Sequence, residues 1–164
     1  MQPYVDGLRK LGIEASALRL PKGAAERAMQ PLRDQVGAEL ATSVIGGHSY
    51  GGRVASMVAA QTPPAGLVLL SYPLHRPGHP EELRTGHWSE IACPVLLLSG
   101  DRDQFARIDL LRASAKLLAL AELHIYPGMG HGLLRVADKV AERIATFARG
   151  LWQAPSRQPR GETR

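Results

Sequence analysis

One stretch of the sequence restricts the possible folds more than any other. At Val44–Ala55 an apolar run leads into Gly47-x-Ser49-x-Gly51, and a helical pattern of small residues follows. This pattern between a strand and a helix is typical of a sharp turn that presents the serine hydroxyl as a nucleophile. A side chain at either flanking glycine is expected to collide with neighbouring backbone. The alternative interpretation is a glycine-rich turn in which Ser49 only caps a helix.

The other apolar segments predict an α/β fold with a mostly parallel sheet and helices on both faces. Continuous apolar runs are typical of strands that are buried on both faces. The expected strands are residues 13–20, 43–46, 67–70, 95–98 and 123–126. Helical patterns occupy residues 3–11, 24–40, 52–61, 108–120 and 134–149. Because strands alternate with helices, the carboxyl ends of the strands are expected to lie along one edge of the sheet.

Length and composition predict one domain. The chain has 164 residues, of which 45% are hydrophobic, which is enough to build a core. We assign residues 1–152 to this domain. Residues 153–164 are polar and rich in proline and arginine, so we expect a disordered tail there.

Charge and cysteine content argue against several classes of protein. The net charge of +5 comes from scattered residues that form no basic helix face, so we expect no nucleic-acid partner. No apolar stretch has the length of a membrane-spanning helix and the start of the chain shows no signal sequence, so we expect no membrane association. The single cysteine, Cys93, cannot form an intramolecular disulfide, and a cytoplasmic location is expected.

Candidate catalytic residues follow three of the predicted strands. Ser49 follows the strand predicted at 43–46. Asp101 and Asp103 follow the strand predicted at 95–98, and His131 lies between two glycines after the strand predicted at 123–126. The order serine, acid, histidine is one of the known orders of a Ser-His-Asp triad. Asp103 is the preferred acid and Asp101 is the alternative. Otherwise Asp103 would be a loop-capping carboxylate paired with a nearby arginine, and His131 would be a solvated loop residue.

A further segment of the sequence is more specific. Residues 70–78 read Leu-Ser-Tyr-Pro-Leu-His-Arg-Pro-Gly, and Glu-Leu-Arg follows at 82–84. With these segments, the acid loop at 100–105 and the histidine loop at 130–131, the chain resembles the α/β-hydrolase superfamily. More narrowly, it is similar to the cap-less branch related to dienelactone hydrolase, and the likeness extends over residues 3–150.

The resemblance implies the α/β-hydrolase fold and a serine hydrolase of the carboxylesterase type. By position it makes Ser49 the nucleophile, where dienelactone hydrolase has a cysteine, with Asp103 as the acid and His131 as the base. His131 would take the Ser49 proton during attack on an ester, thioester or amide carbonyl, and the N–H of Tyr50 would stabilise the oxyanion. The expected partner is a small-molecule acyl substrate, and no metal or organic cofactor is expected.

The long loop after the third predicted strand contains the candidate substrate contacts. Tyr72, Leu74 and His75 are predicted to line an acyl or leaving-group pocket, and the alternative is that Tyr72 and Trp88 are core residues. The loop is too short for a helical cap domain, so the site is expected to be open. Its histidines match no compact zinc pattern. His48, which precedes the nucleophile, is expected to pack or hydrogen-bond beneath the turn.

The start of the chain departs from the resembled family. There, a second oxyanion donor comes from a loop that follows a strand before the first helix, whereas Met1 lies only a few residues before that helix. We therefore expect a sheet without the N-terminal strands: the chain begins upstream, the sheet closes differently, or another chain completes it. The expected consequences are weak hydrolysis and a tendency to form homodimers. The alternative functions are a catalytically silent interaction module and a flavodoxin-like binder of small ligands.

Overall fold

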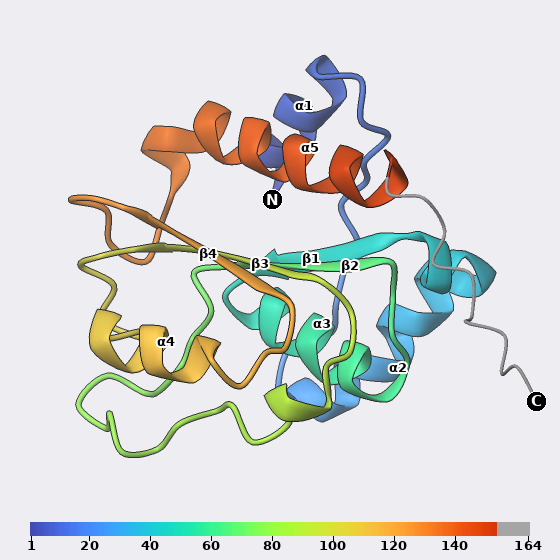
Figure 1. Ribbon diagram of the computed structural model, residues 1–164. Coiled ribbons are helices and arrows are strands. Elements are labelled where there is room, and N and C mark those ends of the chain that lie inside the picture. The colour runs from blue at the N-terminus through green and yellow to red at the C-terminus, as the bar shows by residue number, and fades with distance from the viewer. Residues whose placement is uncertain (154–164) are drawn as a thin grey trace, which may run out of the picture.

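The structure, a computed structural model, describes residues 1–153, and these contain one four-stranded parallel sheet (Figure 1). The strands lie in chain order: β1 (Val44–His48), β2 (Gly66–Leu70), β3 (Val95–Gly100) and β4 (Ala121–Tyr126). Every neighbouring pair is parallel, so each connection crosses over a face of the sheet. The prediction of a mostly parallel α/β fold is confirmed.

Helices cover both faces of the sheet, as predicted (Figure 1). One face carries α1 (Gln2–Lys10) and α5 (Ala137–Gln153), which pack against each other. The other face carries α2 (Ala25–Val36), α3 (Tyr50–Gln61) and α4 (Ile108–Ala115). Short 3₁₀ helices form at Gly37–Thr42, Trp88–Glu90 and Leu134–Val136. Within residues 1–153, none of the helices has both the length and the apolar character that crossing a membrane requires.

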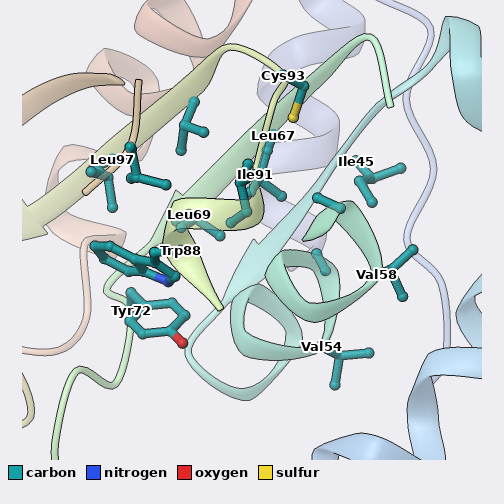
Figure 2. Close-up of a cluster of buried hydrophobic side chains, with 14 of the residues drawn as sticks. Ile45, Val54, Val58, Leu67, Leu69, Tyr72, Trp88, Ile91, Cys93 and Leu97 are labelled. Carbon is teal, nitrogen blue, oxygen red and sulfur yellow. The ribbon is translucent and has the colours of Figure 1, made fainter. Parts of the chain in front are cut away.

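The apolar run of β2 is explained by burial on both faces. Leu67 and Leu69 belong to the cluster under α2 and α3, whereas Val68 and Leu70 belong to the cluster under α1 and α5. Alternate side chains of a strand point to opposite faces, so a strand inside a doubly covered sheet is apolar at every position. Figure 2 shows the first cluster, in which Leu69 lies near the Trp88 ring and Leu67 lies near Cys93.

The strand predicted at residues 13–20 is not present. The segment connects α1 to α2 without forming a ladder, and Leu18 within it is 38% exposed. Both main-chain polar groups of Arg19 are bonded by the side-chain amide of Gln35 instead of by a neighbouring strand. The prediction was wrong because the segment buries too little apolar surface and has no strand beside it, which leaves β1 at the edge of the described sheet.

Several helix boundaries also differ from the predicted ones, and the helix predicted at 108–120 ends at Ala115. The helical pattern at 24–40 changes after Val36, because Gly37 takes a positive φ of 63° and the chain continues as a 3₁₀ helix. At the other end of the chain, α5 includes Gln153, the first residue of the expected tail. The rest of that tail lies outside the described residues.

Candidate active site

Ser49 lies at the sharp turn between β1 and α3. Its φ of 52° and ψ of −114° are values that residues other than glycine seldom adopt. The main-chain N–H of Ser49 donates to the carbonyl of Leu70 on the neighbouring strand, at 2.8 Å. This is the strained strand-to-helix geometry that the glycine–serine–glycine pattern predicts.

The close approach of β1 to α3 requires glycine at two positions. A Cβ on Gly47 would lie 2.6 Å from the carbonyl carbon of Gly51, and a Cβ on Gly52 would lie 2.7 Å from the carbonyl oxygen of Gly47. Outside its own helical turn, Gly51 has no atom within 4 Å of the corresponding position. The prediction that a side chain would collide with the backbone is therefore confirmed for Gly47 and wrong for Gly51. The second close contact with β1 is made by Gly52 instead.

His131 bridges Ser49 and Asp103. Its Nε2 lies 2.8 Å from Ser49 Oγ, and its Nδ1 lies 3.0 and 2.9 Å from the two carboxylate oxygens of Asp103. Because an ionised carboxylate only accepts hydrogen bonds, Nδ1 carries the proton and Nε2 accepts from the Ser49 hydroxyl. The arrangement can therefore move the hydroxyl proton to His131 as Ser49 attacks an electrophile.

The acid of this chain is enclosed, whereas the imidazole is partly accessible. The side chain of Asp103 is 0% exposed and that of His131 is 22% exposed. Asp103 Oδ1 also accepts the main-chain N–H of Phe105, at 2.8 Å. A buried carboxylate needs several donors, because an unpaired charge in the interior is costly.

Asp101, the alternative acid, has a different place. It is exposed, and its Oδ1 accepts the N–H of Gly128 at 2.7 Å, which fixes the turn after β4. The nearby Arg107 forms its ion pair with Asp109, at 2.7 Å. The structure thus brings Asp103, and not Asp101, to the imidazole of His131.

Two rings flank the imidazole of His131. The ring centroid of Phe105 lies 4.4 Å from it, and that of His48 lies 5.1 Å from it. The Nε2 of His48 also donates to the main-chain carbonyl of His131 at 2.8 Å, so the hydrogen bond expected of His48 is made to the histidine loop. Sequence reasoning gave Phe105 no role, and its only signal is its position two residues after the acid.

The N–H of Tyr50 is the first of α3, directly after Ser49. Within the described residues it has no hydrogen-bond acceptor. The phenol of Tyr50 is engaged elsewhere, because it donates to the carbonyl of Pro21 at 2.8 Å. A free N–H at the start of a helix is suited to bind an oxyanion that forms beside Ser49.

The three residues predicted to contact substrate have buried side chains. Tyr72, Leu74 and His75 are each at most 2% exposed. Tyr72 packs edge-on against Trp88 with ring centroids 4.9 Å apart (Figure 2), and its hydroxyl donates to the carbonyl of Arg84 at 2.6 Å. The alternative interpretation of Tyr72 and Trp88 as core residues is confirmed. The burial of Tyr72, Leu74 and His75 does not support the prediction that these three side chains contact substrate.

His75 joins the loop after β2 to the acid loop. Its main-chain N–H donates to the carbonyl of Phe105 at 3.0 Å, and its Nε2 accepts the N–H of Arg107 at 3.1 Å. Its Nδ1 donates to the carbonyl of Arg76 at 2.8 Å. Both ring nitrogens of His75 are therefore occupied by main-chain groups, and the side chain supports the segment that carries Asp103.

One surface group of the described residues has the composition of a metal site. The ligand atoms of His79, Glu81 and Glu82 lie within 4.8 Å of one another, and all three residues are exposed. Arg76 already pairs with Glu82, at 2.6 Å. The expectation that the protein uses no metal stays a prediction.

Known hydrolases have the same fold. A protein described as a predicted CIB-like hydrolase from Thermoplasma acidophilum shares 20% identity and a TM-score of 0.70, over 91% of this chain and 80% of that one. The monoacylglycerol lipase of Paleococcus ferrophilus shares 13% identity and a TM-score of 0.72, over 90% and 88% of the two chains. For a thermophilic esterase from Thermogutta terrifontis the values are 16% and 0.69, over 90% and 85%.

At these identities the likeness concerns the fold alone. The sequence supplies the family, because a family model described as an alpha/beta hydrolase domain matches residues 12–149. The matched segment spans every strand of the sheet and includes Ser49, Asp103 and His131. The chain therefore belongs to the α/β-hydrolase family.

Proposed function

We propose that the protein is a serine hydrolase of the carboxylesterase type, which cleaves a small ester, thioester or amide through an acyl-enzyme on Ser49. The observation that carries the proposal is the chain of hydrogen bonds from Ser49 through His131 to the buried Asp103. Membership of the α/β-hydrolase family supports hydrolytic activity, and the neighbours in fold include a lipase and an esterase.

In this mechanism Ser49 Oγ attacks the substrate carbonyl carbon while His131 Nε2 takes the hydroxyl proton. Asp103 holds the other proton on Nδ1 and stabilises the imidazolium that forms. The carbonyl oxygen becomes an oxyanion, which accepts a hydrogen bond from the N–H of Tyr50. His131 then returns its proton to the leaving group. A water molecule, deprotonated by the same imidazole, attacks the acyl-enzyme, and the proton passes back to Ser49 as the acid leaves.

The site is proposed to be open to small acyl substrates. Between β2 and β3 the chain forms the 3₁₀ helix Trp88–Glu90 and no α-helical cap. This supports a place in the cap-less branch similar to dienelactone hydrolase. No metal, organic cofactor, nucleic acid or membrane has a part in the proposal.

We place the enzyme in the cytoplasm, and two features bear on its surroundings. The buried free thiol of Cys93 is typical of a reducing compartment.

Within residues 1–153, β1 pairs with β2 alone, and an unpaired strand edge favours the proposed homodimer.

A fluorophosphonate probe, which reacts with activated serine hydroxyls, tests the function. The wild-type protein should form one adduct, located by peptide mass spectrometry on Ser49, and should hydrolyse p-nitrophenyl acetate. Ser49→Ala should lose both the adduct and the hydrolysis. Ser16→Ala, a matched change at an exposed serine, should retain both.

Two results would contradict the proposal. One is a wild-type protein that folds but forms no adduct on Ser49. The other is equal labelling of the wild type and Ser49→Ala. Either outcome would favour the catalytically silent interaction module, which keeps the fold without the chemistry.

A further inference from the structure

We propose that His48 is a positioning residue, which holds the main chain of His131 and so sets the distance between the imidazole and Ser49. The inference rests on the proposed function in one respect only, namely that His131 acts on Ser49. The contact itself is the hydrogen bond from His48 Nε2 to the carbonyl oxygen of His131, at 2.8 Å.

The histidine loop has few other main-chain restraints at this point. Before it, Met129 donates to the carbonyl of Tyr126 and accepts the N–H of Arg102. After it, Leu133 is fully buried. Between these anchors, the main chain of Gly130–Gly132 makes no other hydrogen bond within the described part of the protein. Two glycines make the segment flexible, so the contact from His48 is expected to decide where the residue between them lies.

The position of His48 in the sequence makes this contact effective. His48 is the last residue of β1, where it pairs with Leu70, and the N–H of Ser49 bonds to the same residue of β2. One strand end therefore carries both the nucleophile and the donor that holds its base. His131 is fixed twice by this strand end, through Nε2 at Ser49 Oγ and through its own carbonyl oxygen, each at 2.8 Å.

The protonation state of the His48 imidazole suits a donor to the His131 carbonyl. A carbonyl oxygen only accepts, so His48 carries its proton on Nε2. Burial lowers the pKa of His48, against the opposing effects of the hydrogen bond to the His131 carbonyl and of the Asp103 charge, and a positive charge on His131 lowers it further. A neutral His48 avoids a second positive charge 5.1 Å from the imidazole that becomes cationic during catalysis.

Two amide variants separate positioning from simple packing. In His48→Gln the side-chain amide can place an N–H close to where Nε2 lies, so the donor to His131 is kept. In His48→Asn the amide is one methylene shorter and cannot reach the carbonyl. His48→Leu fills the space without any donor. His79→Gln, at an exposed histidine outside the site, serves as the control.

The readouts are kcat and KM for p-nitrophenyl acetate, and the proton NMR signal of the Nδ1–H that His131 donates to Asp103. His48→Asn and His48→Leu should lower kcat by about 10- to 100-fold, because small misplacements of a catalytic group cost rates of this order. KM should change less than about twofold. The NMR signal should shift or broaden in both variants, whereas His48→Gln should stay within a few-fold of wild type in kcat and keep the signal.

The inference is overturned if His48→Gln loses as much kcat as His48→Asn, or if His48→Asn keeps wild-type kcat and the wild-type NMR signal. The NMR signal needs no turnover. If the wild-type protein proves inactive, the proposed hydrolase function fails, while an unchanged signal in His48→Asn would still refute the positioning role and a changed signal would support it. The two failures are therefore distinguishable.

Discussion

The ring of Phe105 packs against the imidazole of His131, with centroids 4.4 Å apart. The main-chain N–H of Phe105 also donates to Asp103 at 2.8 Å, and its carbonyl accepts the N–H of the buried His75. One residue of the acid loop thus contacts both the acid and the base, and is itself tied to the interior. Phe105 therefore holds Asp103 and packs on the His131 ring, while His48 holds the main chain of His131.

Asp103→Asn should lower kcat by about 10⁴-fold, as a triad does when its imidazole is held in the wrong tautomer. The asparagine side chain offers an N–H where His131 Nδ1 needs an acceptor, so Nε2 loses its ability to accept the Ser49 proton. Steady-state hydrolysis of p-nitrophenyl acetate measures the effect. The variant should remain folded, because asparagine has nearly the size of aspartate.

Asp101→Asn is the matched control. Its carboxylate accepts the N–H of Gly128, and the amide oxygen of asparagine can accept the same bond. We expect kcat to stay within about threefold of wild type, since the residue does not contact the reacting groups. A larger loss in Asp101→Asn than in Asp103→Asn would show that the wrong carboxylate has been assigned as the acid.

Gly47→Ala should abolish both activity and stable folding. The added Cβ would lie 2.6 Å from main-chain atoms of Gly51, so β1 and α3 would have to separate at the turn that holds Ser49. Gly51→Ala adds the same methyl group where the structure leaves space, and should stabilise α3 slightly because alanine is the better helix former. Thermal unfolding of both variants measures the difference, and equal melting temperatures would contradict it.

The central part of the fold is predictable from sequence because it depends on continuous apolar runs. β2 and β3 are buried on both faces, so their sequences show it directly. The segment at 13–20 has a looser alternation that a strand and an irregular connection share. Only the absence of a neighbouring strand decides between them, and a single sequence contains no information on that pairing.

The residues of the candidate site also fall into those that the sequence could predict and those that it could not. Ser49, Asp103 and His131 could be placed because each follows a predicted strand, and carboxyl ends of parallel strands meet at one edge. The roles of Phe105 and His48 depend on which rings touch His131, and that depends on loop conformation. Burial of His75 was not predictable either, because its ring bonds main-chain groups of Arg76 and Arg107, one of them remote in sequence.

Ser71→Gly should raise the free energy of unfolding. Ser71 is fully buried, has a positive φ of 45°, and its hydroxyl has no hydrogen-bond partner within residues 1–153. Glycine removes both the backbone strain and the unpaired polar group, which are each worth about 1–3 kcal/mol. After the entropy that glycine gains in the unfolded chain, we expect a net gain of about 1 kcal/mol.

Ser71→Ala separates the two causes, because it removes the hydroxyl but keeps a Cβ at the positive φ. It should stabilise the protein less than Ser71→Gly does. Urea unfolding of the three proteins measures this order. A Ser71→Gly protein that is less stable than wild type would mean that the Ser71 hydroxyl has a partner, such as an ordered water molecule.

His87 should make the protein less stable at acid pH. Ser56 donates its hydroxyl proton to the carbonyl of Arg53, so the Ser56 oxygen accepts from His87 Nε2, at 2.8 Å. Burial, and after it the charge of Arg53, lower the pKa of His87 below its usual value of 6.5. As the pH falls below about 6.5 the unfolded chain binds a proton before the folded one does, so the free energy of unfolding decreases with falling pH.

His87→Gln keeps an N–H for Ser56 but cannot be protonated in this range. Urea unfolding at pH 7.5 and pH 5.0 should show a smaller loss of stability in the variant than in the wild type. Part of the loss should remain, because burial lowers the pKa of His48 as well, with the same sign. If wild type and His87→Gln lose the same free energy of unfolding between the two pH values, His87 is not a source of the acid sensitivity.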